Sequence, residues 1–243
     1  MKVAHIVPIA LLPLTKFNDY HLVLPHLMEE GSPYDEFYTK EATGHKILDN
    51  GIAEAVHVEH QELLRIASRL EADEVVAPDV MGDRPATVEA VRAFRTHALS
   101  HPEFDYIGVI QGKSYSDLAA MLAFYIQEEW ISVIAVPRVL CHTVHKDIRF
   151  NFVNAFAGDI TNRFKAVHFL GAASSNPKEV LQLRDTIARG MDTSFPSVMG
   201  LDKRLIETDH GVSRGEGFFE AQPNPPQLMC IEHNINSYVE WAR

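Results

Sequence analysis

Three aspartates stand where a carboxylate could take part in chemistry. They are Asp49, Asp79 and Asp192, and each lies beside a glycine or proline at the end of a short apolar run. Such a run predicts a buried strand that ends in a turn. Carboxylates gathered at one site can divide the work, because one can attack carbon while another transfers a proton or holds a polar ligand. The same residues also suit a structural role, since Asp is common in turns and at helix starts.

A fourth apolar run, from Tyr106 to Ile110, ends in Gln111 and Gly112. The glutamine amide offers both donors and an acceptor, so it can bind the edge of a purine-like base. The glycine lets the backbone approach a ligand closely. A turn leading into the next helix explains the same two residues equally well.

Apolar runs alternate along the chain with segments of helical periodicity. The predicted strands are 2–9, 21–27, 47–49, 74–77, 106–110, 131–136, 167–170 and 190–193. The predicted helices lie near 58–70, 85–98, 115–126, 152–160, 177–188 and 228–242. Segments 29–46 and 197–226 read as turns and loops. The pattern favours a compact TIM-type (β/α)8 barrel, with an open doubly wound α/β sheet as the alternative. In a barrel the C-terminal strand ends share one mouth, which would bring the polar residues together.

Length and composition indicate a single barrel domain over residues 1–243. The chain is 46% hydrophobic, which suits one sizeable core, and its two cysteines fit a reducing, cytoplasmic compartment. No run is long enough for a membrane span, and the apolar start lacks a signal-peptide cleavage pattern. The formal net charge of −11 argues against a general nucleic-acid binder, although it leaves room for a local basic surface.

Histidine and cysteine pairs raise the question of a metal site. Cys141, His142 and His145 lie close in sequence, as do Cys230 and His233. Neither group has a second ligand cluster at a typical spacing, so we expect no metal and no other cofactor. Basic residues are expected to rim the mouth and meet phosphates, with solvated loop charges as the alternative. These residues are Lys113, Arg138, Lys203, Arg204 and Arg214.

An ordered set of short segments between about residues 45 and 240 resembles the tRNA-guanine transglycosylase family, especially its compact relatives that modify DNA with 7-deazaguanines. The set is Leu48-Asp49-Asn50-Gly51, Ala77-Pro78-Asp79, Gly108-Val109-Ile110-Gln111-Gly112, Phe169-Leu170-Gly171, Ala188-Arg189-Gly190-Met191-Asp192 and Ile231-Glu232-His233-Asn234. No single segment is specific, and the resemblance depends on their order.

The resemblance implies exchange of guanine in a nucleic acid for a 7-deazaguanine such as preQ0. Asp192 would be the nucleophile that forms a covalent glycosyl-enzyme, and Asp49 the general acid and base. Asp79, Gln111 and Gly112 would bind the base. The family also implies the barrel fold and suggests a homodimer.

Several positions depart from the family pattern. Asp192-Thr193-Ser194-Phe195 has only the first aspartate of an Asp-x-x-Asp pattern, and Val136-Pro137-Arg138 replaces a Gly-Gly-Leu segment. The Cys-x-Cys-x-x-Cys zinc cluster is absent, which predicts a chain without the zinc-binding subdomain and favours DNA over tRNA. Two alternatives remain: a non-catalytic member that binds nucleic acid or the active subunit, and a metal-dependent barrel hydrolase using Asp49, His142, His145 and His168.

Overall fold

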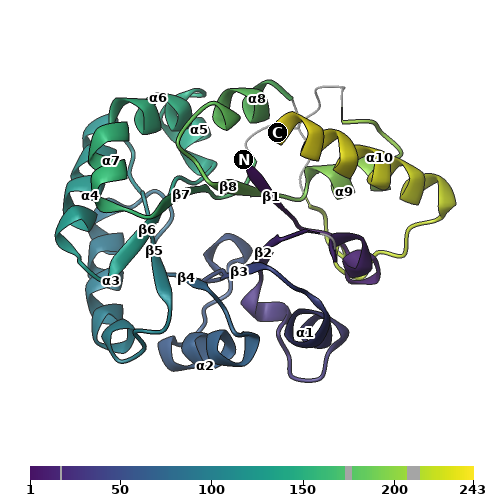
Figure 1. Cartoon of the computed structure of the whole chain (residues 1–243), viewed down its shortest axis with the longest axis horizontal. Helices are drawn as coiled ribbons and strands as arrows, with labels where there is room; N and C mark the ends of the chain where they lie inside the picture. Colours follow the sequence, from purple (N-terminus) through teal and green to yellow (C-terminus); the bar gives the residue numbers. More distant parts are fainter. Residues whose placement is uncertain (17, 173–176, 207–213) are drawn as a thin grey trace.

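Eight parallel strands form one sheet that curls into a nearly closed barrel (Figure 1). The computed structural model describes residues 1–16, 18–172, 177–206 and 214–243. The sheet order is β1-β8-β7-β6-β5-β4-β3-β2, so β1 and β2 are its two edges. The strands are β1 (Lys2–His5), β2 (Tyr20–Val23), β3 (His45–Leu48), β4 (Glu74–Val76), β5 (Asp105–Val109), β6 (Ile131–Ala135), β7 (Ala166–Phe169) and β8 (Gly190–Thr193). The predicted (β/α)8 barrel is confirmed, and the open doubly wound sheet is not the fold.

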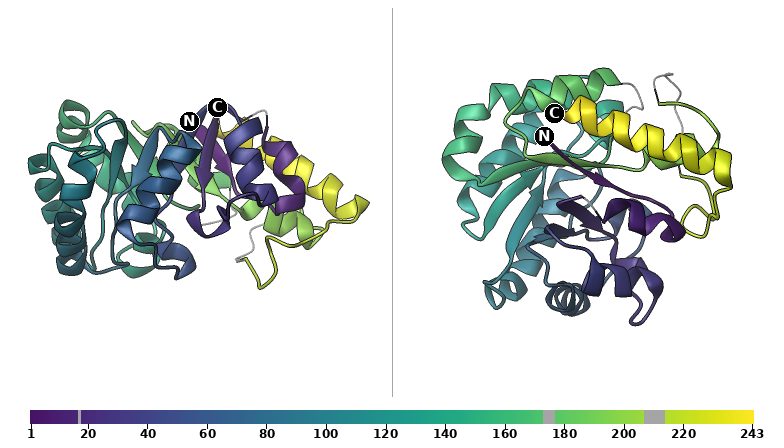
Figure 2. Two further views of the ribbon diagram at one scale, coloured as in Figure 1. Left: turned by 90° about the horizontal axis from the view of Figure 1, so that it is seen from below. Right: turned by 45° about the vertical axis from the view of Figure 1, so that its right-hand side comes forward.

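Helices surround the barrel and connect most strands (Figures 1 and 2). They are α2 (His60–Leu70), α3 (Arg84–Leu99), α4 (Tyr115–Gln127), α5 (Val139–Thr143), α6 (Ile148–Ala155), α7 (Ala157–Arg163), α8 (Pro177–Arg184), α9 (Phe195–Leu201) and α10 (Pro225–Ala242). Local sequence sets several starts, because Ser114 caps α4 and Asn224 forms a capping box with Gln227 at α10. None of the helices in the described segments is long and apolar enough to cross a membrane.

The first third of the chain departs most from the predicted pattern. Short helical turns replace full helices around β2: η1 (Ile9–Thr15), η2 (Pro25–Leu27), α1 (Pro33–Glu36) and the π-helix η3 (Phe37–Glu41). Segment 29–46, predicted as turns, therefore contains helix. Ser32 caps α1, and Phe37 and Tyr38 are buried, so tertiary packing stabilises turns too short to show helical periodicity.

Two further predictions on elements need correction. Segment 197–226, predicted as loop, contains most of α9, whose residues from Phe195 to Gly200 are buried; residues 207–213 lie outside the described part of the chain. The helix predicted over 152–160 is two helices, α6 and α7, that meet at Phe156. A turn, η4 (Ile52–Glu54), follows β3.

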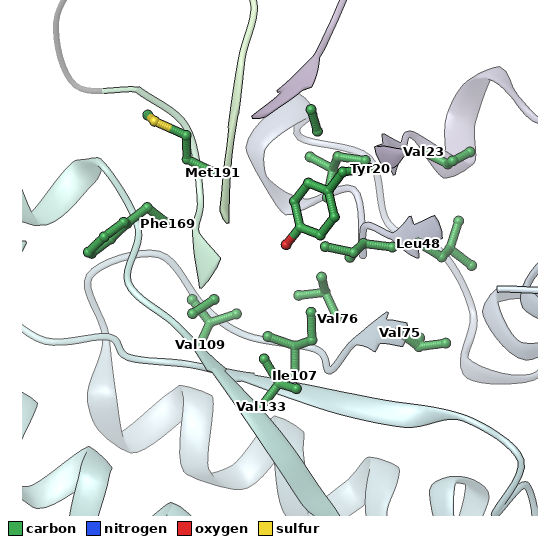
Figure 3. Close-up of a cluster of buried hydrophobic side chains, with 14 of the residues drawn as sticks. Tyr20, Val23, Leu48, Val75, Val76, Ile107, Val109, Val133, Phe169 and Met191 are labelled. Carbon is green, nitrogen blue, oxygen red and sulfur yellow. The ribbon is translucent and has the colours of Figure 1, made fainter. Parts of the chain in front are cut away.

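Several strand side chains point into the barrel interior, as Figure 3 shows. Tyr20 of β2 points its hydroxyl toward the middle of the barrel, with Val76 and Ile107 beside it. Gly190 provides the space for this ring, because a Cβ there would lie 2.5 Å from the Tyr20 Cε1 atom. The interior thus holds a buried polar side chain, Tyr20, below the C-terminal ends of the strands.

Candidate active site

The three predicted aspartates line one cavity at the C-terminal ends of the strands. Asp49 follows β3, Asp79 follows β4, and Asp192 lies within β8. The cavity has a volume of about 270 Å³, and its walls combine these carboxylates with apolar side chains. The apolar lining residues include Ile6, Leu22, Leu24, Ile52, Met81, Val109 and Leu170. Apolar walls with a few convergent polar groups are typical of a site for a small molecule.

Asp79 is held in place by two side-chain amides. Asn50 Nδ2 donates to one carboxylate oxygen at 2.6 Å, and Gln111 Nε2 donates to the other at 2.6 Å. The carbonyl oxygen of Gln111 accepts from the Gly82 backbone N–H at 2.9 Å. Burial raises the pKa of Asp79, while the two amide donors act in the opposite direction. Gln111 therefore directs Asp79 into the cavity and keeps one amide N–H and one carbonyl lone pair for a ligand.

Asp49 sits in the environment of a general acid. Its carboxylate accepts from the Gly51 N–H at 3.3 Å, and Gly51 adopts a φ of 84° that favours glycine. Burial, followed by the negative charges of Asp192 and Asp79, raises the pKa of Asp49 from 3.8 to about 7. At neutral pH this carboxyl group therefore exchanges readily between its protonated and ionised forms.

Asp192 is oriented by two hydrogen-bond partners at a single oxygen. The Gly171 N–H donates to Oδ1 at 2.8 Å, and His168 Nε2 lies 3.1 Å from the same atom. The Gly171 peptide is itself fixed, because the buried Arg149 guanidinium donates to its carbonyl oxygen at 2.6 Å. Asp192 is almost fully buried yet lines the cavity. The carboxylate is thus presented rigidly beside Asp49, as a nucleophile requires.

The remaining predicted residues divide into two groups. Arg138 and Arg214 line the cavity. Arg214 pairs with Glu54 and its guanidinium lies 5.6 Å from the centre of the Phe219 ring. Arg138 is exposed, and no hydrogen bond or ion pair engages its guanidinium within the described segments.

Four predicted residues are described but do not line the cavity: Gly112, Lys113, Lys203 and Arg204. Gly112 has a packing role, because a Cβ there would lie 2.4 Å from the Asp117 Cβ at the start of α4. Lys203 and Arg204 follow α9, and Lys113 lies between β5 and α4.

Sequence reasoning missed two features of the site. Asn50 was interpreted only as part of a turn, and His168 only as a metal ligand in an alternative. Adjacent parallel strands place Asn50, after β3, next to Asp79, after β4, and this neighbour relation was the available signal.

Among the residues that the structure describes, no cluster of metal ligands supports the alternative of a metal-dependent hydrolase. No group of three or more His, Cys, Asp or Glu side chains in the described part of the chain is arranged to hold a metal ion. His142 lines the cavity, whereas both ring nitrogens of His168 face protein partners, Tyr20 and Asp192.

Comparison with known proteins assigns no family. No model of a known protein family matches the chain, and a search of curated proteins returns no match. The fold and the geometry of the cavity are therefore the basis on which a function can be argued.

Proposed function

We propose that this protein is a transglycosylase that exchanges guanine in a nucleic acid, DNA in preference to tRNA, for a 7-deazaguanine. The observation that carries the proposal is the convergence of Asp49, Asp79 and Asp192 on one cavity in three different environments. Asp192 is fixed by donors, Asp49 titrates near neutral pH, and Asp79 is aimed by two amides. Environments that separate the properties of neighbouring carboxylates allow each to take a different role.

The exchange proceeds in two displacements. In the first, an Asp192 oxygen forms a bond to C1′, the C1′–N9 bond breaks, and its electron pair leaves with guanine, which receives the proton held by Asp49. In the second, N9 of the 7-deazaguanine gives its proton to the Asp49 carboxylate and attacks C1′. The ester bond then breaks, and its electron pair returns to Asp192. The pKa of about 7 at Asp49 suits a group that gives a proton in one step and accepts one in the next.

Base binding is assigned to Asp79. Each of its oxygens accepts one amide hydrogen bond and retains capacity for another, so the carboxylate can accept two N–H donors from the edge of guanine. Ile52 and Met81 are partly exposed apolar side chains in the cavity lining and can contact the faces of the ring. Arg138 is the cation in the lining best placed to meet a phosphate, because Arg214 already pairs with Glu54.

The second aspartate of the family's Asp-x-x-Asp pattern is replaced by Phe195, which also lines the cavity. Because Asp192 is the remaining carboxylate of that segment and has two hydrogen-bond partners at one oxygen, it is the nucleophile in this proposal.

The test is incorporation of labelled guanine into duplex DNA, single-stranded DNA and tRNA in separate reactions. We expect label in DNA, and a protein–DNA adduct on a denaturing gel that disappears in Asp192→Asn. Asp185→Asn, which changes an exposed aspartate, is the matched control and should behave as wild type. Binding of DNA without label or adduct would instead identify a non-catalytic nucleic-acid-binding protein.

A further inference from the structure

A buried row of hydrogen-bonding side chains runs from Asp192 down into the barrel. His168 of β7 places Nε2 3.1 Å from Asp192 Oδ1 and Nδ1 2.7 Å from the hydroxyl of Tyr20. His168 and Tyr20 are 0% and 1% exposed, so water cannot replace these partners. Figure 3 shows the Tyr20 hydroxyl directed into the barrel interior. Tyr20 has no role in the exchange as described above, and His168 enters it only as a contact of Asp192.

The direction of the hydrogen bonds is set at the lower end of the row. Arg189 donates to both oxygens of Glu74 at 2.6 Å, and its Nη2 lies 3.4 Å from the Tyr20 oxygen. A guanidinium can only donate, so the Tyr20 oxygen accepts from Arg189. Burial raises the pKa of Tyr20, and the phenol therefore keeps its proton. Among the described residues, His168 Nδ1 is the acceptor in reach of that proton.

We propose that Tyr20 holds His168 as the neutral Nε2–H tautomer and that His168 in turn donates to Asp192 Oδ1. Both are therefore positioning residues, and they leave Asp192 Oδ2 as the attacking atom. Oδ1 then receives two N–H groups, from Gly171 and His168, whereas no hydrogen bond within the described segments engages Oδ2. The tautomer assignment stands on these contacts and on the protonated phenol of Tyr20, and it does not depend on the proposed function. The assignment of the attacking oxygen rests on the proposed function.

The other protonation states fit the contacts poorly. The Nδ1–H tautomer would set the Nε2 lone pair against a carboxylate oxygen at 3.1 Å and leave the Tyr20 proton without an acceptor. An imidazolium would also donate to the Tyr20 oxygen, which already accepts from the Arg189 cation. Each alternative leaves a buried polar hydrogen unpaired, which is costly.

This arrangement serves both displacements. Bond formation through Oδ2 leaves Oδ1 as the carbonyl oxygen of the ester, with its two donors in place. When the ester breaks, negative charge returns to the carboxylate, and the same donors stabilise it as a leaving group. A nucleophile that must also depart benefits from donors on the oxygen that does not bond to carbon.

The tautomer is measured directly on the ligand-free protein. Nitrogen-15 NMR of histidine-labelled protein, with the signal assigned by its loss in His168→Gln, should show Nε2 protonated and Nδ1 unprotonated at pH 7. Tyr20→Phe should shift these two signals toward a mixture of tautomers. A protonated Nδ1 in the wild type would overturn the proposal.

A second pair of variants tests the effect on Asp192. Glutamine can accept from Tyr20 and donate to Asp192, so His168→Gln should keep activity within about tenfold, whereas His168→Leu should lose about 10- to 100-fold in kcat/KM. His168→Leu should also move the acid limb of the pH profile to higher pH, because a carboxylate that loses a donor gains basicity. A merely structural role would lower activity without moving that limb, and equal activity of the two variants would refute the role.

The experiments distinguish failure of the positioning proposal from failure of the proposed function. Absence of base exchange with the expected NMR signals would reject the reaction and leave the tautomer standing. Normal exchange in His168→Leu would reject the positioning role and leave the reaction standing.

Discussion

Replacing Asp49 by asparagine should make the protein more stable at neutral and alkaline pH and much less active. The pKa of Asp49 rises from 3.8 to about 7 because the side chain is buried and because Asp192 and Asp79 are negatively charged. Between these values the folded state holds a proton that the unfolded state releases. The free energy of unfolding of the wild type therefore falls as pH rises through this window.

The magnitude follows from the two pKa values. Each pH unit between 3.8 and about 7 corresponds to about 1.4 kcal/mol, which gives about 4 kcal/mol in total. Asparagine stays neutral, so the stability difference between Asp49→Asn and wild type should grow by about 4 kcal/mol from pH 4 to pH 8. Activity should fall by about 10²- to 10⁴-fold, as expected when a general acid is removed.

Urea unfolding at pH 4, 5, 6, 7 and 8 measures the difference, and guanine incorporation measures the activity. Asp185→Asn is the control, because its side chain is 70% exposed and its stability should track the wild type at every pH. Parallel stability curves for Asp49→Asn and wild type would refute the assigned pKa. A gain in stability without loss of activity would refute the role of Asp49 in proton transfer.

Three further predictions concern charge and burial. Arg138→Ala should reduce the slope of log affinity for DNA against log salt concentration by about 1. Lys165→Ala is the control and should not change this slope, because Lys165 precedes the N-terminal end of β7, whereas the cavity lies at the C-terminal ends of the strands. Glu74→Ala should cost about 3–5 kcal/mol in urea unfolding at pH 7, because it leaves the part-buried Arg189 guanidinium unpaired. Burial lowers the pKa of His5 from 6.5 to about 4, so the folded state resists protonation there and stability falls as pH drops through that window. His5→Leu should remove about 3 kcal/mol of that loss, measured as the variant's gain over wild type between pH 6.5 and 4.

The strands and the position of the mouth could be predicted from sequence because they depend on local pattern. Apolar runs that end beside glycine or proline mark β3, β5 and β8, and parallel pairing then brings their C-terminal ends together. Weak periodicity explains the errors around β2. There, turns such as α1 and η3 are stabilised by burial of their own aromatic side chains, Tyr34, Phe37 and Tyr38, and are too short to show helical periodicity.

The orientation of the site could not be predicted, because it depends on contacts between residues far apart in sequence. Gln111 lines the cavity and stays a predicted base-binding residue, but the hydrogen bond from its amide to Asp79, 32 positions earlier, has no local sequence signal. Tyr20 and His168 are 148 positions apart and meet only because β2 and β7 face one interior. Sequence pattern identifies which side chains reach the mouth, whereas hydrogen-bond geometry decides which of them remain free for a ligand.

The charge balance at the mouth bears on which nucleic acid the proposed reaction can use. A chain with a net charge of −11 repels a polyanion overall, and four carboxylates line the cavity: Asp49, Asp79, Asp192 and Glu54, which pairs with Arg214. Protonation of Asp49 removes one of these charges, and Arg138 and Arg214 supply the cations of the lining. With Arg138 as the proposed phosphate contact, the backbone would contribute little affinity, and most of it would come from the base that Asp79 is proposed to bind. Extruding a guanine from a duplex costs a few kcal/mol, so the protein should act faster on single-stranded or distorted DNA than on a perfect duplex.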